Sequence, residues 1–485
     1  MQIRVFFRTF AADMQILVAI LSIFFLQFAD KAGSERVCLS ELAIEMREQR
    51  GITIDSLDYE VSPQYLDSIR AMGAKVLHTS RWLNGATVQI PASQIAAFYQ
   101  CSFIQAIELT RDANESIGSS SISLRKHAVD SSIPSDPPPL VTEAQHFLYN
   151  LPPLHQAGFE GQGIRIGVAD GGFYNADSLP ALPQEHWLGY ADFTDEKNDI
   201  FGTKGKHGAM CLTAIMAKSD SYQGAATKAD YFLFRTEEPD TESPKEIDNW
   251  VAAIEMADSL GLHIVSTSLG YTTFDTEVFN FSYADMNGRN SRGAQAAIIA
   301  ARKGLLLIVA AGNDGDKTWH YISTPADADS ILTVGAVDIF GEIAGFSSFG
   351  PSADGRVKPE VCAVGFQTVL VDPSNGNLIY SNGTSFACPL VAGMAACLWS
   401  ALPNATNMEI RDRIIRSANR YTQPHEQYGY GIPNAWLAYT GETTTLPYTI
   451  SNVEISSSYS KIIQNGQLYI RHQGATYNLL GKKIE

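Results

Sequence analysis

The sequence predicts an α/β fold with a mostly parallel central sheet, preceded by a small α+β domain and followed by a short β tail. Between residues 143 and 441, short runs rich in β-branched and apolar residues alternate with helical patterns. This alternation is typical of a parallel sheet that helices cover on both faces. The runs that predict strands are Ile164–Ala169, Ala229–Phe234, His263–Ser268, Leu305–Ala311 and Ile331–Val337. Functional residues of such sheets gather at the carboxyl ends of the strands.

One helix between these strands is marked at both ends. Ser243 is the expected N-cap, Pro244 occupies the first helical position and Glu246 completes a capping box. Gly261 stops the helix. Residues 143–441 are therefore expected to form one large domain.

Residues 33–110 have the pattern of a separate α+β domain. Helices are expected from Ser62-Pro63 to Gly73 and over Pro91–Tyr99. Alternating runs predict strands at Lys75–Thr79, Ala86–Ile90 and Ile104–Leu109. Residues 111–142 are rich in Ser, Asp and Pro, which predicts an exposed and cleavable linker.

The first 32 residues predict the compartment. Residues 16–28 are apolar except for Ser22 and Gln27, and these 13 residues match a signal-peptide core. They fall short of the roughly 20 residues that span a bilayer. We therefore expect residues 1–32 to be a signal peptide and the protein to be secreted, periplasmic or at the cell surface, with no membrane span after its removal. A retained anchor is the alternative, and Met14 is a second candidate start.

Charge and cysteine content narrow the function classes. The 485 residues carry 52 acidic and 35 basic side chains, a net charge of −17, which argues against a nucleic-acid partner or binding to an anionic membrane. The hydrophobic content of 45% is ample for a large core. The 6 cysteines are scattered and no pair has zinc spacing, so we expect buried apolar thiols without a disulfide scaffold.

Three polar residues occur where an acyl-transfer mechanism needs them. Asp170 ends a predicted strand, His207 opens a predicted helix and Ser385 heads another. Taken alone, an Asp after a strand more often forms a turn, a His more often is a hydrogen-bonded polar residue without a catalytic role, and a Ser more often caps a helix. Ala387 rules out the G-x-S-x-G elbow, and the chain order Asp, His, Ser differs from the orders of α/β-hydrolases and chymotrypsin. The order that remains is that of subtilisin.

Five motifs in family order then resemble the subtilisin-like serine peptidases, or subtilases, over residues 143–441. They are Ile166–Gly172, His207–Ala209, Ser268–Gly270, Ala310–Asn313 and Gly383–Pro389. The resemblance implies a three-layer subtilisin-like fold in which Ser385 is the nucleophile and His207 the general base and then acid. Asp170 would orient the imidazole, and Asn313 would stabilise the oxyanion together with the backbone N–H of Ser385.

The same resemblance implies a substrate pocket and its ligands. Its two walls would be formed by Ser268, Leu269 and Gly270 and by Ala310, Ala311 and Gly312. Thr324-Pro325 would be a cis peptide at its floor, beside Ser323. The resemblance implies that the chemistry requires no cofactor and that the partner is a protein or peptide substrate. It allows a structural calcium ion, to which no residues of this sequence are assigned.

Residues 33–110 resemble the subtilase propeptide, so the chain's own propeptide is expected as an inhibitor. The leading interpretation is a secreted endopeptidase made as an inhibited precursor. Gly171, Ala209 and Met210 depart from the family pattern, so a catalytically silent binding protein on the same scaffold is the alternative. Cys211 resembles the thiol of the cysteine-containing subtilases.

The last segment, residues 442–485, is expected to contain a hairpin of Gln467–Arg471 and Ala475–Leu480. It resembles the terminal part of sorting domains of the type IX secretion system. A hairpin packed on the preceding domain is the alternative.

Overall fold

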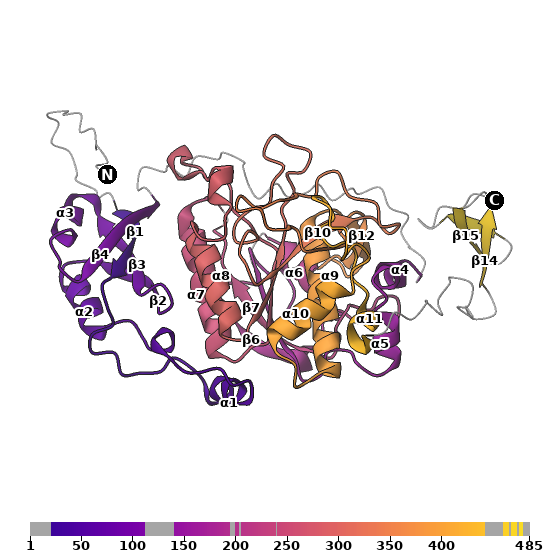
Figure 1. Ribbon diagram of the computed structural model, residues 1–485, viewed down its shortest axis with the longest axis horizontal. Helices are drawn as coiled ribbons and strands as arrows, with labels where there is room; N and C mark the ends of the chain where they lie inside the picture. The colour runs from indigo at the N-terminus through magenta and orange to yellow at the C-terminus, as the bar shows by residue number, and fades with distance from the viewer. Residues whose placement is uncertain are drawn as a thin grey trace.

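The computed structural model describes residues 21–111, 140–194, 199–202, 205–238 and 240–441, and three strands of the C-terminal tail between residues 459 and 478. Figure 1 shows a small domain that contains the N-terminal strands beside a larger domain of strands and helices. The linker predicted over residues 111–142 lies mostly outside the described residues. Helix α4 already begins at Leu140, within the predicted linker.

The large domain is built on a parallel sheet of 7 strands, in the order β11-β10-β9-β8-β5-β7-β6. The strands are β5 (Arg165–Asp170), β6 (Trp187–Asp192), β7 (Asp230–Arg235), β8 (Ile264–Thr267), β9 (Leu306–Ala310), β10 (Leu332–Val337) and β11 (Val361–Val364). This confirms the predicted α/β fold, and each of the five predicted strands lies within one residue of its predicted bounds. The edge strands β6 and β11 were not predicted.

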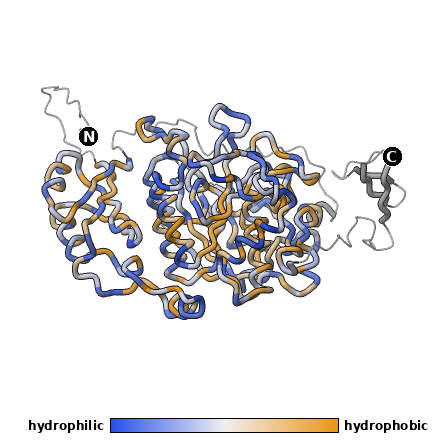
Figure 2. Tube along the Cα trace, viewed as in Figure 1, coloured by the Kyte–Doolittle hydropathy of each residue, from blue (hydrophilic) through white to orange (hydrophobic). Residues whose placement is uncertain are grey.

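Two hydrophobic cores cover the two faces of this sheet. Successive residues of β8 and β9 point to opposite faces, so Ile264 and Ile308 join one core while Val265 and Val309 join the other. Helices α6 (His207–Met216) and α9 (Thr384–Ala401) belong to the first core, and α7 (Pro244–Ser259) and α8 (Arg292–Arg302) to the second. Figure 2 shows apolar segments concentrated through the middle of this domain. The result is a three-layer arrangement.

Shorter elements complete the large domain. The other helices are α4 (Leu140–Leu148), α5 (Pro152–Gln156), α10 (Asn407–Arg416) and α11 (Ala435–Thr440), and β12 (Thr368–Val371) pairs with β13 (Leu378–Ser381). By length and hydropathy, α9 is the one described helix that could cross a membrane, but 89% of it is buried inside the fold. Its apolar sequence is explained by its place in the core.

The N-terminal domain is an antiparallel sheet of 4 strands, in the order β2-β3-β1-β4. Its elements are β1 (Leu21–Phe28), α1 (Glu41–Gln49), α2 (Pro63–Ala71), β2 (Lys75–Ser80), β3 (Gly85–Pro91), α3 (Ile95–Phe98) and β4 (Ile104–Arg111). Ser62 caps α2 and Pro63 opens it, as predicted.

Strand β1 corrects the predicted signal-peptide boundary. Leu21–Phe28 lies in the middle of the sheet between β3 and β4, and Leu26 and Phe28 are fully buried. The prediction that residues 1–32 form a signal peptide is therefore wrong for residues 21–32. A short apolar run fits a signal-peptide core and a buried central strand equally well, and its pattern alone does not separate the two. Residues 1–20 lie outside the described residues.

The tail contains the predicted hairpin. Strand β15 (Gln467–His472) pairs antiparallel with β16 (Ala475–Asn478), and β14 (Tyr459–Gln464) adds a third strand. The likeness to a sorting domain stays a prediction. All 6 cysteines are unpaired. Four are buried, as predicted, but the prediction is wrong for Cys38 and Cys101, which are half-buried.

Candidate active site

The carboxyl edge of the parallel sheet collects the candidate residues, as the fold class predicts. Asp170 is the last residue of β5, Ser268 follows β8 directly and Asn313 follows β9 by three residues. His207 is the first residue of α6, and Ser385 is the second residue of α9.

Asp170 and His207 form a hydrogen-bonded pair. Nδ1 of His207 lies 2.9 Å from Oδ1 and 3.1 Å from Oδ2 of Asp170. The carboxylate is 1% exposed, and its Oδ1 also accepts the backbone N–H of Gly171 at 2.8 Å. With Nδ1–H donating to the carboxylate, Nε2 of His207 is the free acceptor nitrogen. This is the orientation that a general base needs.

A glycine after His207 makes this close approach feasible. A Cβ at position 208 would lie 2.5 Å from the carbonyl oxygen of Gly172 and 2.7 Å from Cβ of Asp170. Only a residue without a side chain lets the start of α6 come so near the end of β5.

The charge of Asp170 sets the proton affinity of the imidazole. Burial alone disfavours the charged imidazole, but the neighbouring carboxylate and its hydrogen bond outweigh burial, so the pKa of His207 is held well above its usual range. Asp170 therefore stabilises the imidazolium form that proton transfer from a serine would create.

Ser385 lies next to this pair, at the start of α9. The ring of Phe386 packs against the His207 imidazole with centroids 5.4 Å apart. Sγ of Cys211 lies 3.4 Å from the carbonyl oxygen of Ser385 and 3.9 Å from Nδ1 of His207. Cys211 thus bridges the helix that carries the histidine and the helix that carries the serine.

The Ser385 hydroxyl does not form the expected hydrogen bond with His207 among the described residues. Its Oγ donates instead to the carbonyl oxygen of Ser268 over a long 3.4 Å. Hydrogen bonds between catalytic groups often tighten only once substrate is bound.

The amide of Asn313 is oriented by the residue before the candidate nucleophile. Its Oδ1 accepts the backbone N–H of Thr384 at 2.8 Å and the Thr384 hydroxyl at 3.1 Å. Since Oδ1 is occupied, the amide NH₂ is the end that remains to donate.

Two glycine-containing segments face each other across Ser323. A Cβ on Gly270 would lie 2.0 Å from Oγ of Ser323, and one on Gly312 would lie 3.5 Å from it. Ser323 is 4% exposed and its hydroxyl lacks a partner in the described part of the chain. Thr324-Pro325 is cis, as predicted. The predicted pocket residues Ser268, Leu269, Gly270, Ala310, Ala311 and Gly312 are thus brought to one region, beside Ser385.

The sequence missed Thr384 as a site residue, and it missed the hydrogen bond made by Ser268, which was predicted only as a pocket wall. Thr384 fixes the Asn313 amide, and the Ser268 hydroxyl donates to the carbonyl oxygen of Ser385 at 2.7 Å. Both residues lie in quoted motifs, so the motifs marked the right segments. The sequence does not show which hydroxyl bonds to which backbone group.

A group of three glutamates lies beside the site. Oxygens of Glu237, Glu242 and Glu246 lie within 4.8 Å of one another. Glu237 accepts the hydroxyls of Tyr271 and Thr236, and Glu246 caps α7 through the backbone N–H groups of Ser243 and Glu238. Since two of the three carboxylates act as hydrogen-bond acceptors for the protein itself, we assign no calcium ion to this group.

Comparison with known proteins agrees with this geometry. The model of the subtilase family matches residues 161–431. The chain belongs to the subtilase family. The model of the peptidase S8 propeptide domain of Bacteroidota matches residues 24–126, which include β1. This supports the corrected boundary of the N-terminal domain.

Individual subtilases are similar over the same region. The chain is 30% identical over 292 residues to a thermostable alkaline protease of Halalkalibacterium halodurans, covering 60% of this chain and 71% of the relative. It is 27% identical over 290 residues to a subtilisin of Bacillus pumilus, covering 59% and 94% of the two chains. It is 28% identical over 302 residues to subtilisin DY of Bacillus licheniformis, covering 61% and 99%. The protein is thus a serine endopeptidase made with a propeptide domain.

Proposed function

We propose that this subtilase is an exported endopeptidase that cleaves peptide bonds through an acyl-enzyme on Ser385 and is made as a precursor inhibited by its own propeptide. One observation carries the mechanism: the buried Asp170 is hydrogen-bonded to His207 beside the first turn of α9, which contains Ser385.

The acylation step follows from the orientation of the imidazole. Oγ of Ser385 attacks the carbonyl carbon of the substrate while its proton passes to Nε2 of His207. His207 then gives this proton to the leaving amine nitrogen as the carbon–nitrogen bond breaks and an ester to Ser385 remains. Water, deprotonated by His207, attacks the ester, and the proton returns to Oγ as the acid product leaves. Asp170 stays ionised throughout.

The negative charge of each tetrahedral intermediate needs fixed donors. The Asn313 NH₂ is free to donate because Thr384 holds Oδ1. The backbone N–H of Ser385 lies in the first turn of α9, where N–H groups have no partner within the helix. Together they supply two donors that need no reorganisation during the reaction.

Substrate would lie against the segments 268–270 and 310–312. Gly270 leaves room for a substrate strand to approach the backbone, as strand addition requires. The Ser323 hydroxyl is buried between Gly270 and Gly312 and has no hydrogen-bond partner among the residues that the structure describes. It would narrow this pocket and offer one hydrogen bond to a polar side chain of the substrate.

Export and maturation complete the proposal. A leader would end before Leu21, because β1 belongs to the propeptide sheet. Maturation would cut the chain between Leu109 and Thr142. The departures at Gly171, Ala209 and Met210 leave Asp170, His207, Asn313 and Ser385 in place.

A fluorophosphonate probe tests the proposal directly. The wild-type peptidase, once it has processed itself and released the propeptide, should be labelled quickly at Ser385, and Ser385→Ala and His207→Ala taken through the same incubation should stay unlabelled. The Ser385→Ala precursor should also stay uncut when it is purified alone, while the wild-type precursor processes itself. A folded wild-type protein that is neither labelled nor processed would establish the silent binding scaffold instead.

A further inference from the structure

A long segment of the N-terminal domain leaves its sheet and lies against the far ends of two helices of the peptidase domain. Residues 30–61, which we call the strap, connect β1 to α2 and contain α1. Figure 1 shows α1 well apart from the N-terminal sheet, at the lower end of the large domain. The backbone N–H of Ser40 donates to the carbonyl oxygen of Ser259, at the end of α7, at 2.8 Å. The strap is therefore docked on the peptidase domain from its first helix.

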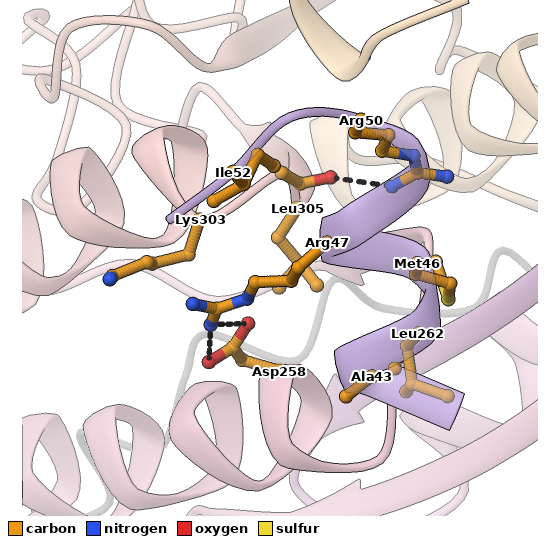
Figure 3. A pocket seen from close by; sticks show the side chains of 11 residues that line it. Ala43, Met46, Arg47, Arg50, Ile52, Asp258, Leu262, Lys303 and Leu305 are labelled. Carbon is orange, nitrogen blue, oxygen red and sulfur yellow. Dashed lines mark hydrogen bonds and ion pairs between the residues drawn. The ribbon is translucent and has the colours of Figure 1, made fainter. Parts of the chain in front are cut away.

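Arg47 of α1 is the centre of this contact. Its guanidinium donates to both oxygens of Asp258 in α7, at 2.8 and 2.7 Å (Figure 3). It also donates to Asp58 of the strap, at 2.7 Å. Asp58 also binds Nζ of Lys303, just beyond α8, at 2.8 Å. All four side chains are 5% exposed or less. Arg81, from the turn between β2 and β3, also donates to Asp258, at 2.6 Å. Asp258 and Asp58 thus each have two buried cationic partners.

The backbone of the peptidase domain comes equally close to the strap. A Cβ on Gly261, just after α7, would lie 3.1 Å from the backbone of Ala43, and one on Gly304, just after α8, would lie 2.7 Å from Ile52. The guanidinium of Arg50 lies 4.8 Å above the ring of Trp399 in α9 and donates to the Gly304 carbonyl oxygen at 3.3 Å. The strap thus fits the ends of α7, α8 and α9 by shape as well as by charge.

The body of the N-terminal domain contacts other parts of the same helices. The turn between β2 and β3 surrounds the Glu255 carboxylate with the Ser80 hydroxyl and the backbone N–H groups of Arg81 and Trp82. Near the start of α7, Thr87 donates to Asp248. The 16 residues of α7 extend over roughly 24 Å, so the body and the strap together follow its whole length.

We propose that the strap is a second docking element, outside the active-site cleft, that keeps the propeptide bound to its own peptidase domain after the linker has been cut. The proposal rests on the precursor organisation proposed above. Two linked contacts hold a ligand far longer than either alone, because one contact keeps the other at a high effective concentration. Cutting of the linker would then not release the propeptide, and release would require loss of the strap contact.

The experiment uses the full-length Ser385→Ala chain with a recognition site for an unrelated protease placed within residues 112–139. After that protease has cut the chain, the N-terminal fragment is labelled, and its dissociation is followed after addition of excess unlabelled cut protein. Arg47→Met removes one of two cationic partners from Asp258 and from Asp58, which keep Arg81 and Lys303. Loss of these charge-assisted hydrogen bonds should speed dissociation about tenfold or more.

Arg70→Met is the matched control, because Arg70 is exposed and pairs with Asp67 inside α2. It removes the same group from the same domain and should not change the rate. Asp258→Asn weakens the Arg81 contact as well as the Arg47 contact, so it should speed dissociation from the peptidase side. The Arg47→Met effect should be smaller in that background, since the Arg47–Asp258 pair is already lost.

Equal dissociation rates for folded Arg47→Met and Arg70→Met would overturn the proposal. If Arg47→Met does not fold, Asp258→Asn and Arg50→Gln decide the matter by the same comparison. The readout is binding by a chain that lacks the serine hydroxyl, so it does not depend on peptidase activity. Failure of the strap proposal and failure of the proposed function are therefore distinguishable.

Discussion

Gly208→Ala tests whether the close approach of α6 to β5 is what places the imidazole. A Cβ at this position would lie 2.5 Å from the carbonyl oxygen of Gly172, where ordinary contacts begin at 3.4 Å, so the start of α6 must move by about 0.9 Å. His207 is the preceding residue and moves with it. Since a misplacement of about 1 Å costs on the order of a hundredfold in rate, we expect kcat to fall by about that factor.

The assay is steady-state cleavage of a peptide substrate, with kcat and KM determined separately. KM should change little, because segments 268–270 and 310–312 do not touch Gly208. Gly171→Ala is the matched control, because Gly171 also lies next to Asp170. A Cβ on Gly171 would lie 3.5 Å from the nearest atom of Glu237, which is an ordinary van der Waals distance, so kcat should change little. A melting curve confirms folding, and alanine favours a helix over glycine by about 1 kcal/mol. Folded Gly208→Ala with wild-type kcat would refute the reasoning.

Three further predictions concern titration and the thiol. Because Asp170 raises the pKa of His207, the ascending limb of the plot of kcat/KM against pH should lie on the alkaline side of the usual histidine range. Asp170→Asn should move this ascending limb to lower pH. An unmoved limb would contradict the role of His207 as the general base. Burial raises the pKa of Glu237 to about 7 and that of Glu242 well above its usual value, so both bind protons more tightly in the folded state. The stability that these two carboxyls contribute should thus be full at low pH and be lost as pH rises through about 7. The melting temperature of Glu242→Gln should therefore gain on that of the wild type as pH rises over this range, and a difference that does not change with pH would count against the prediction. A mercurial that modifies Cys211 should inactivate the enzyme, because this thiol contacts the backbone of Ser385, and it should do so slowly because the thiol is buried. The variant Cys211→Ser should stay active. Full activity of a protein whose Cys211 is shown to be modified would contradict this prediction.

Much of the peptidase domain could be predicted from the sequence because local rules decide it. Ser243, Pro244 and Gly261 bound α7 as caps of known chemistry do. The apolar runs of the parallel sheet are buried on both faces, and this produces an unbroken signal in the sequence. Asp170 and His207 were found for the same reason, since each stands at the end of an element whose position the sequence fixes locally.

The N-terminal strand and the serine hydroxyl could not be predicted in this way. Residues 21–28 are apolar whether they form a signal-peptide core or a central strand, and only pairing with β3 and β4 separates the two. The side chain of Ser385 has several staggered positions at the start of α9, and its hydrogen bond to Ser268 depends on a neighbouring strand end. In both cases the deciding contact is distant in sequence.

The contact between the strap and the peptidase domain could not be predicted either, because it too depends on residues far apart in the sequence. Helix α1 is short and mostly polar, and an arginine at position 47 predicts a solvated side chain. It is buried because Asp258, 211 residues away, lies opposite. Glu255 and Asp258 are covered by the N-terminal domain and touch none of the catalytic residues proposed here, so substitutions along this face of α7 should alter propeptide retention while leaving the kinetics of the released peptidase unchanged. Substitutions at the carboxyl ends of the strands should alter the kinetics of the released peptidase while leaving propeptide retention unchanged. The two sets of variants therefore separate maturation from peptide-bond hydrolysis within one domain.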